Sequence, residues 1–245
     1  IPPGGHHVLD AFLQFLAPLG LARGPVEWRM PVPEAAHAWA REQLPGDQPT
    51  LLVSPCSSHV LRNWRPERYA AVADHAAAQG WRVVLCGGRS ALERETTDAI
   101  LAAMKAPALD LVGKDTFKQL LALLARATLV MSPDSGPAHM ANAMGTAVLG
   151  LHACTDAERS GPYSDRRWTV NRYAEAAEKF MGKPAGQLAW GRRIAQVFYR
   201  VPKVGYQLGI KRPTAPQRIA QILSGEMGYG DIAQRVIKRL VFQRG

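Results

Sequence analysis

Eight residues near the middle of the chain, SPDSGPAH at positions 132–139, combine features that suit a negatively charged ligand. They follow a short apolar run and precede a run of small apolar residues, which predicts a strand, a loop and a helix. Asp134 or Ser135 can cap this helix, and Pro137 suits its first turn, where an N–H has no intrahelical partner. Gly136 lets a ligand approach the backbone. Free N–H groups and the helix dipole indicate a phosphate site, although an ordinary capped helix fits the same residues.

A second loop, PCSSHVLRNW at positions 55–64, also follows an apolar run. The hydroxyls of Ser57 and Ser58 and the guanidinium of Arg62 suit a diphosphate, because an arginine stays charged and can donate two parallel hydrogen bonds. A turn that carries a surface arginine fits these residues equally well.

A third and weaker element is CGGR at positions 86–89, followed by Glu93. Paired glycines let a nucleotide pack against the backbone, and a carboxylate can bind ribose hydroxyls. On its own, a glycine pair after a strand mostly marks a turn.

Other kinds of site are excluded by their missing signatures. The sequence has no GxxxxGK[ST], GxGxxG, HExxH or GxSxG motif. Its three cysteines lack CxxC spacing, which is typical of reduced thiols in an intracellular protein. No run of 18 apolar residues occurs, so we expect no transmembrane helix. His59, His139 and His152 fall on the predicted ligand loops, but an isolated histidine is more often structural than catalytic.

The elements that must position these loops alternate along the chain, which predicts an α/β fold with a parallel sheet and helices on both faces. Ligands of such sheets bind beyond the carboxyl ends of the strands, where the loops described above begin. The expected strands are 50–54, 82–86, 109–112, 128–131 and 147–151, and the expected helices are 6–19, 34–44, 66–79, 91–104, 116–126 and 136–144. In the helix 116–126 we expect Phe117, Leu120, Leu121 and Leu124 to face inward.

The three loops together resemble the lipopolysaccharide heptosyltransferase family (glycosyltransferase family 9) over about residues 7–195. The resemblance is carried by SSHVLRNWRPERYAAVA, by VVLCGG with LERE, and by the long segment from DLVGKDTF to LHACTD. It implies a two-domain GT-B fold whose C-terminal Rossmann-like domain binds a nucleotide-sugar donor. Residues 1–45 would be the remnant of an N-terminal acceptor domain that is otherwise missing here. Residues 46–195 would be the donor-binding domain, and residues 196–245 a basic tail of unknown role.

The same resemblance implies a role for each matching residue. Arg62 and Asp134 would be catalytic, with Arg62 standing where the family usually has lysine and Asp134 binding heptose hydroxyls. The general base would lie in the acceptor domain, outside this chain. The other donor-binding residues would be Ser57 and Ser58 at a phosphate, Ser135, Gly136 and Pro137 at the diphosphate, His139 with no assigned step, and Glu93, Gly113 and Lys114 near the ribose and adenine.

The implied reaction transfers heptose from ADP-L-glycero-D-manno-heptose to the lipid A–Kdo inner core, with inversion and without a metal or cofactor. As ADP leaves, negative charge builds on its diphosphate, and Arg62 with the helix N-terminus would stabilise that charge. The alternatives are a family-9 enzyme with another nucleotide sugar, or a donor-binding module that is inactive without its N-terminal domain.

The charge distribution bears on partners and location. Of the net charge of +10, most comes from residues 196–245, where nine Lys or Arg stand against two acidic residues. Such a tail is attracted to anionic lipid by about 1 kcal/mol per basic residue, so we expect a cytoplasmic protein that can be peripheral on the inner membrane. A solvated tail or an altered reading frame is the alternative. We expect no nucleic-acid partner, because the tail does not interleave aromatic and basic residues regularly.

Overall fold

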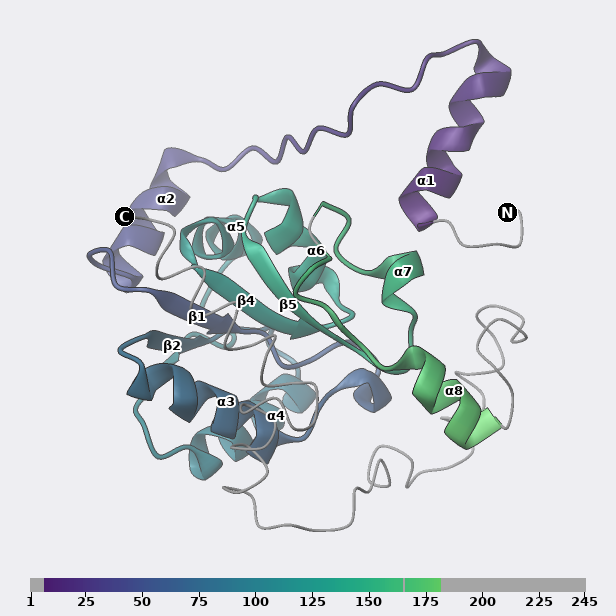
Figure 1. Cartoon of the computed structure of the whole chain (residues 1–245). Coiled ribbons are helices and arrows are strands. Elements are labelled where there is room, and N and C mark those ends of the chain that lie inside the picture. Colours follow the sequence, from purple (N-terminus) through teal and green to yellow (C-terminus); the bar gives the residue numbers. More distant parts are fainter. Residues whose placement is uncertain (1–6, 165, 182–245) are drawn as a thin grey trace.

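The computed structural model describes residues 7–164 and 166–181. The predicted tail 196–245, and residues 182–195 of the predicted donor-binding domain, lie outside the described residues. The described part is built on a six-stranded sheet in the order β3-β2-β1-β4-β5-β6, with every neighbouring pair parallel (Figure 1). Its strands are β1 (Thr50–Val53), β2 (Arg82–Leu85), β3 (Leu109–Asp110), β4 (Leu129–Pro133), β5 (Ala147–His152) and β6 (Val170–Asn171).

The helices that cover the sheet begin within one residue of their predicted positions. Pro66 opens α3 and Pro137 stands in the first turn of α6, since proline has no N–H to lose there. Capping boxes open two others, with Ser90 paired to Glu93 and Thr116 paired to Gln119. The helices that cover the sheet include α2 (Glu34–Gln43), α3 (Pro66–Ala78), α4 (Ala91–Ala103), α5 (Phe117–Arg126) and α6 (Gly136–Ala143).

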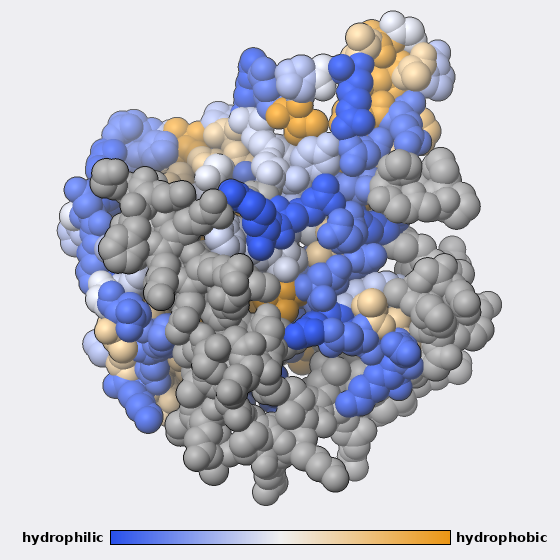
Figure 2. All heavy atoms as spheres, in the orientation of Figure 1, coloured by the Kyte–Doolittle hydropathy of each residue, from blue (hydrophilic) through white to orange (hydrophobic). Residues whose placement is uncertain are grey.

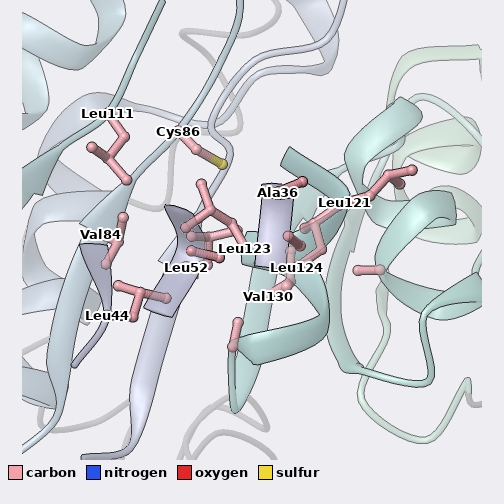
Figure 3. Packing of buried hydrophobic residues seen from close by; sticks show 14 of the residues in the cluster. Ala36, Leu44, Leu52, Val84, Cys86, Leu111, Leu121, Leu123, Leu124 and Val130 are labelled. Atoms are coloured by element: carbon pink, nitrogen blue, oxygen red, sulfur yellow. The ribbon is translucent and has the colours of Figure 1, made fainter. Parts of the chain in front are cut away.

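Each face of the sheet has its own apolar core, which confirms the predicted Rossmann-like α/β fold. On one face α2, α5 and α6 cover β1, β2 and β4, and Figure 3 shows Leu121 and Leu124 of α5 within this cluster. On the other face α3 and α4 pack with the opposite side chains of the strands, around the fully buried Tyr69. Because both faces are covered, the centres of β1, β2 and β4 are continuously apolar rather than alternating, as in Leu51–Val53, Val83–Leu85 and Leu129–Met131.

Several sequence predictions need correction. Phe117 does not face inward: its residue is 57% exposed, because it is the first residue of α5 and lies at the ligand edge of the sheet. The third strand covers only Leu109–Asp110, and β4 runs on to Pro133, into the predicted anion loop. Four elements were not predicted: η2 (Val60–Arg62), α7 (Ala157–Ser160), β6 (Val170–Asn171) and α8 (Tyr173–Met181).

The N-terminal segment predicted as one helix is divided into α1 (Val8–Leu13) and the 3-10 helix η1 (Gln14–Leu19). Gly20 ends it with a φ of 70°, a conformation that suits glycine. This segment is joined to α2 by a chain without regular structure (Figure 1). It carries exposed apolar side chains, among them Phe12 and Phe15, and apolar residues are visible at this end of the molecule in Figure 2. His7 Nε2 lies 2.9 Å from the Gly161 carbonyl oxygen, so the start of α1 is anchored beside α7.

Within the described ranges, no helix is long and apolar enough to cross a membrane. The same part of the chain contains no cluster of three His, Cys, Asp or Glu side chains that could hold a metal ion.

Candidate functional site

The order of the strands brings two of the predicted loops together. Strand order reverses between β1 and β4, and in open parallel sheets the crevice at this reversal is where ligands bind. The loop after β1 carries Arg62 on η2, and the loop after β4 carries Asp134. Arg62 Nη1 lies 3.9 Å from Asp134 Oδ2, with the side chains 33% and 11% exposed. The two strongest sequence motifs therefore form one site.

The loop after β1 is held by its own hydrogen bonds. The Ser57 N–H donates to Asn63 Oδ1 over 2.7 Å, and the Ser57 hydroxyl donates to the His59 carbonyl over 3.0 Å. Ser57 is buried and Ser58 is exposed. Ser57 thus shapes the loop that presents Arg62, and Ser58 is the hydroxyl of the pair that faces outward. Asn63, which the sequence analysis did not single out, closes this loop.

The start of α6 differs from the prediction in one respect. Ser135 is the N-cap residue by position, but neither it nor Asp134 caps the helix with its side chain. The Ser135 hydroxyl pairs instead with Ser132 Oγ at 2.7 Å, and the Asp134 carboxylate contacts groups from other loops. A helix without a side-chain cap keeps its first N–H groups available, and Gly136 and Pro137 complete this first turn.

Asp134 is the electrostatic centre of the site. Its Oδ1 lies 3.4 Å from His139 Nε2, and its Oδ2 accepts a hydrogen bond from the Ser160 hydroxyl over 3.4 Å. Burial acts to raise the pKa of Asp134, but hydrogen bonds from His139 and Thr155 and the positive charges nearby lower it to about 2. The carboxylate is therefore ionised at neutral pH and can accept hydrogen bonds from sugar hydroxyls.

The remaining predicted residues form a second group at the ends of β2 and β3. Glu93 Oε1 accepts a hydrogen bond from the Gly88 N–H over 2.6 Å, and Glu93 Oε2 accepts one from the Ser90 hydroxyl over 2.7 Å. A Cβ atom on Gly88 would lie 2.8 Å from that carboxylate, so the glycine is needed for the close approach of Glu93. Both oxygens of the Glu93 carboxylate thus accept hydrogen bonds from the loop that follows β2.

Gly113 and Lys114 are held in the same local way. Gly113 has a φ of +74°, and its carbonyl accepts a hydrogen bond from Arg89 Nε over 3.1 Å. Lys114 Nζ donates to the Asp110 carbonyl over 2.7 Å. The next residue, Asp115, was missed by the sequence analysis. Burial raises its pKa to about 6, and its buried Oδ2 has no hydrogen-bond partner among the described residues.

The structure therefore joins Arg62, Asp134 and His139, and it leaves Glu93, Gly113 and Lys114 in a neighbouring group. Their roles toward a ligand stay predictions. Thr155 and Ser160, which contact Asp134, were missed because they lie in the segment after β5, for which the sequence analysis predicted no element. The signal for Thr155 was the short polar stretch CTD (154–156) that follows a buried strand, and Ser160 lies outside this stretch.

An open parallel sheet in this order, with helices on both faces, defines a domain of the Rossmann-like class, and a helix N-terminus and an arginine stand at its point of reversal. The model of glycosyltransferase family 9 (heptosyltransferase) matches residues 1–197. The chain belongs to this family.

Relatives of known name agree with this assignment. The chain is 35% identical over 192 residues to the lipopolysaccharide core heptosyltransferase OpsX of Haemophilus influenzae, covering 78% of this chain and 55% of that protein. It is 30% identical over 160 residues to lipopolysaccharide heptosyltransferase 3 of Escherichia coli, covering 64% of this chain and 47% of that protein. The chain thus spans about half the length of the curated relatives it matches.

Two solved structures share the fold. The glycosyl transferase family 9 protein of Veillonella parvula superposes with a TM-score of 0.64 at 20% identity, over 84% of this chain and 62% of that one. Escherichia coli ADP-heptose LPS heptosyltransferase II superposes with a TM-score of 0.53 at 23% identity, over 61% and 46%. The fold predicted from the sequence, the Rossmann-like part of a GT-B glycosyltransferase, is confirmed.

Proposed function

We propose that this chain is the donor-binding part of an enzyme that transfers heptose from ADP-L-glycero-D-manno-heptose to the inner core of lipopolysaccharide. The observation that carries the proposal is the meeting of Arg62 and Asp134 at the point where the strand order reverses. Membership of glycosyltransferase family 9 and the heptosyltransferase names of the relatives support the sugar and the acceptor.

The charges of the site suit the departure of ADP. A guanidinium and the N-terminal N–H groups of α6 offer positive charge to a diphosphate, while the ionised Asp134 offers an acceptor to sugar hydroxyls. When the bond between the sugar and the diphosphate breaks, the diphosphate gains negative charge. Groups that bind this charge more tightly than the intact donor lower the barrier.

In this proposal the transfer inverts the anomeric centre and needs no bound metal or cofactor, because Arg62 and the start of α6 supply the positive charge. In the same proposal an acceptor domain binds the acceptor, lipid A–Kdo, and carries the general base that activates its hydroxyl. We place the reaction at the cytoplasmic face of the inner membrane, next to anionic lipid. Heptose transfer by the enzyme together with its acceptor domain that persists in excess EDTA supports the metal-independent part of the proposal, and loss of transfer in EDTA contradicts that part.

Calorimetric titration tests the donor site directly. ADP-heptose, ADP and UDP-GlcNAc are titrated into the wild type, Asp134→Ala and Asp47→Ala, which makes the same change in the exposed turn before β1, at the opposite edge of the sheet. We expect selective binding of the adenine nucleotides, weakened by Asp134→Ala and unchanged by Asp47→Ala. Preference for UDP-GlcNAc would favour a different nucleotide-sugar donor.

A transfer assay separates the enzyme from a binding module. With ADP-heptose and lipid A–Kdo, the 245-residue chain alone is expected to bind the donor without transferring heptose, since the general base is placed in the acceptor domain. Measurable transfer by this chain alone would show that a base lies within it.

A further inference from the structure

A buried histidine lies behind the Asp134 carboxylate and plays no part in the proposed donor contacts. His152 is the last residue of β5 and is only 3% exposed. Its Nδ1 lies 3.3 Å from the Thr155 hydroxyl oxygen. Its Nε2 is buried and has no hydrogen-bond partner in the described part of the chain. An imidazole placed so deeply with one nitrogen unpaired calls for a physical reason.

The hydrogen-bond partners fix where the protons must be. Asp134 is ionised at neutral pH and can only accept hydrogen bonds, so the Thr155 hydroxyl donates its single proton to that carboxylate. The Thr155 oxygen is then left to accept, and the neutral His152 ring must donate to it from Nδ1–H. This sequence of donors assigns His152 the Nδ1–H tautomer, which is the less common one. The unpaired Nε2 then carries no hydrogen.

We propose that His152 is a positioning residue for the donor sugar, acting through a relay in which His152 Nδ1–H donates to Thr155 and Thr155 donates to Asp134. The proposal rests on the proposed function, since it concerns the carboxylate expected to bind sugar hydroxyls. The relay holds the Asp134 carboxylate from behind, and Arg62 and His139 contact it as well. A carboxylate held from several sides needs no reorientation when the sugar arrives.

The surroundings of His152 favour the neutral ring that the relay requires. Burial lowers the pKa of His152, which opposes a charged ring at neutral pH. Asp134 and Asp156 act in the opposite direction, while His139 and Arg62 add to the lowering. The charged and titratable groups that face the ring therefore come from the loop after β4, from α6, from η2 and from the N-cap of α7.

The backbone also keeps the ring in this place. A Cβ atom on Gly150 would lie 3.2 Å from His152 Nε2, so the glycine two residues earlier makes room for the imidazole. The His152 carbonyl accepts a hydrogen bond from the Arg172 N–H over 2.7 Å, which fixes the end of β5 beside β6. The backbone that carries His152 is thus fixed, and the imidazole has room beside Gly150.

The first test is the tautomer of His152, read from the ring nitrogen shifts in an NMR spectrum of the ¹⁵N-labelled chain at pH 7.5. His152→Asn identifies its signals among those of the other histidines. We expect the Nδ1–H tautomer in the wild type and a shift toward the usual Nε2–H tautomer in Thr155→Val. An Nε2–H tautomer in the wild type overturns the relay, whether or not the chain binds a donor.

The second test compares ADP-heptose with ADP by calorimetry. Loss of one hydrogen bond predicts about 3- to 10-fold weaker binding of ADP-heptose in Thr155→Val and His152→Phe, with ADP changed by less than about 2-fold. Thr155→Ser, which keeps the hydroxyl, and His152→Asn, which keeps a donor in the place of Nδ1, are expected to restore most of the affinity. In the double variant Thr155→Val/His152→Phe the losses do not add, because both changes break the same relay.

The outcomes separate the relay from the function on which it rests. Equal weakening of ADP and ADP-heptose, or full affinity in Thr155→Val, overturns the positioning role. A wild type that binds neither nucleotide contradicts the proposed function, and a wild type with the Nε2–H tautomer contradicts the relay.

Discussion

Two aspartates occupy matching places in this fold and behave in opposite ways. Asp115 follows β3 and directly precedes Thr116, the N-cap of α5, while Asp134 follows β4 and directly precedes Ser135, the N-cap of α6. The pKa of Asp115 is raised to about 6 and that of Asp134 is lowered to about 2. Burial pushes both upward, so the difference comes from the partners that reach Asp134 from other loops.

The two helices that follow these aspartates differ in how their first turns are capped. Thr116 and Gln119 form a complete capping box, so the start of α5 is closed by its own side chains. The Ser135 hydroxyl pairs with the Ser132 hydroxyl, and the start of α6 has no side-chain cap. The first N–H groups of α5 are hydrogen-bonded by side chains of the same loop and so stabilise the fold. The first N–H groups of α6 have no side-chain cap and lie beside the Arg62–Asp134 pair, so they are suited to a ligand.

The largest expected effect is on donor binding. Arg62→Ala removes the guanidinium at the β1–β4 crevice and should weaken ADP binding by about 10- to 100-fold, the usual range for a charged hydrogen bond. Arg62→Lys keeps the charge and should lose less. The matched change in the group at the ends of β2 and β3 is Arg89→Ala, since Arg89 donates a hydrogen bond to the Gly113 carbonyl. It should alter ADP affinity by less than about 3-fold, as measured by calorimetry. An equal loss for Arg89→Ala would break the contrast between the two groups.

Next in size is the stability that ionised Asp134 contributes. Its folded pKa lies below the ordinary value of 3.8, so the contribution is complete above pH 4 and is lost as the pH falls through about 2. Asp134→Asn should therefore lower the free energy of unfolding at pH 7.5 by about 2 kcal/mol. Urea denaturation at pH 7.5 and pH 3 measures this, and the difference between variant and wild type should shrink at the lower pH.

Asp115→Asn should act in the opposite direction and more weakly. The folded pKa of Asp115 is raised, so its contribution to stability is greatest below pH 4 and is lost as the pH rises through about 6. Removing the charge should stabilise the protein at pH 7.5 by on the order of 1 kcal/mol, because solvent and Arg89 already offset part of the burial cost. At pH 4 the two proteins should be nearly equal. A destabilised variant at pH 7.5 would show that the Asp115 charge has a partner.

The smallest effect tests the closed helix start. Thr116→Ala should cost about 1 kcal/mol in the free energy of unfolding, since it removes the cap of α5, and it should leave ADP affinity unchanged. Thr116→Ser keeps the hydroxyl and serves as the control. Weaker ADP binding in Thr116→Ala, at temperatures where the variant is folded, would mean that α5 also contributes to the ligand site.

Local sequence determined the order of the elements and the positions of the loops. Short apolar runs such as 50–54 and 82–86 favour buried strands in this alternating pattern. Pro66 and Pro137 fix where two helices begin, because a helix tolerates proline only in its first turn. The short elements after β5 were missed since a two-residue strand and a one-turn helix carry too few residues to show a period. Phe117 was misplaced because a helical pattern does not show that its first residue lies beyond the core.

The tertiary structure alone decided which loops meet and which carboxylates are charged. Arg62 and Asp134 come together because β1 and β4 are neighbours in the sheet, although β2 and β3 lie between them in sequence. The charge of a side chain depends on the distance to groups from distant segments, so Asp115 and Asp134 look alike in sequence and differ in the fold. The same reason hid Thr155 and the position of His152 behind Asp134, which only the packed structure reveals.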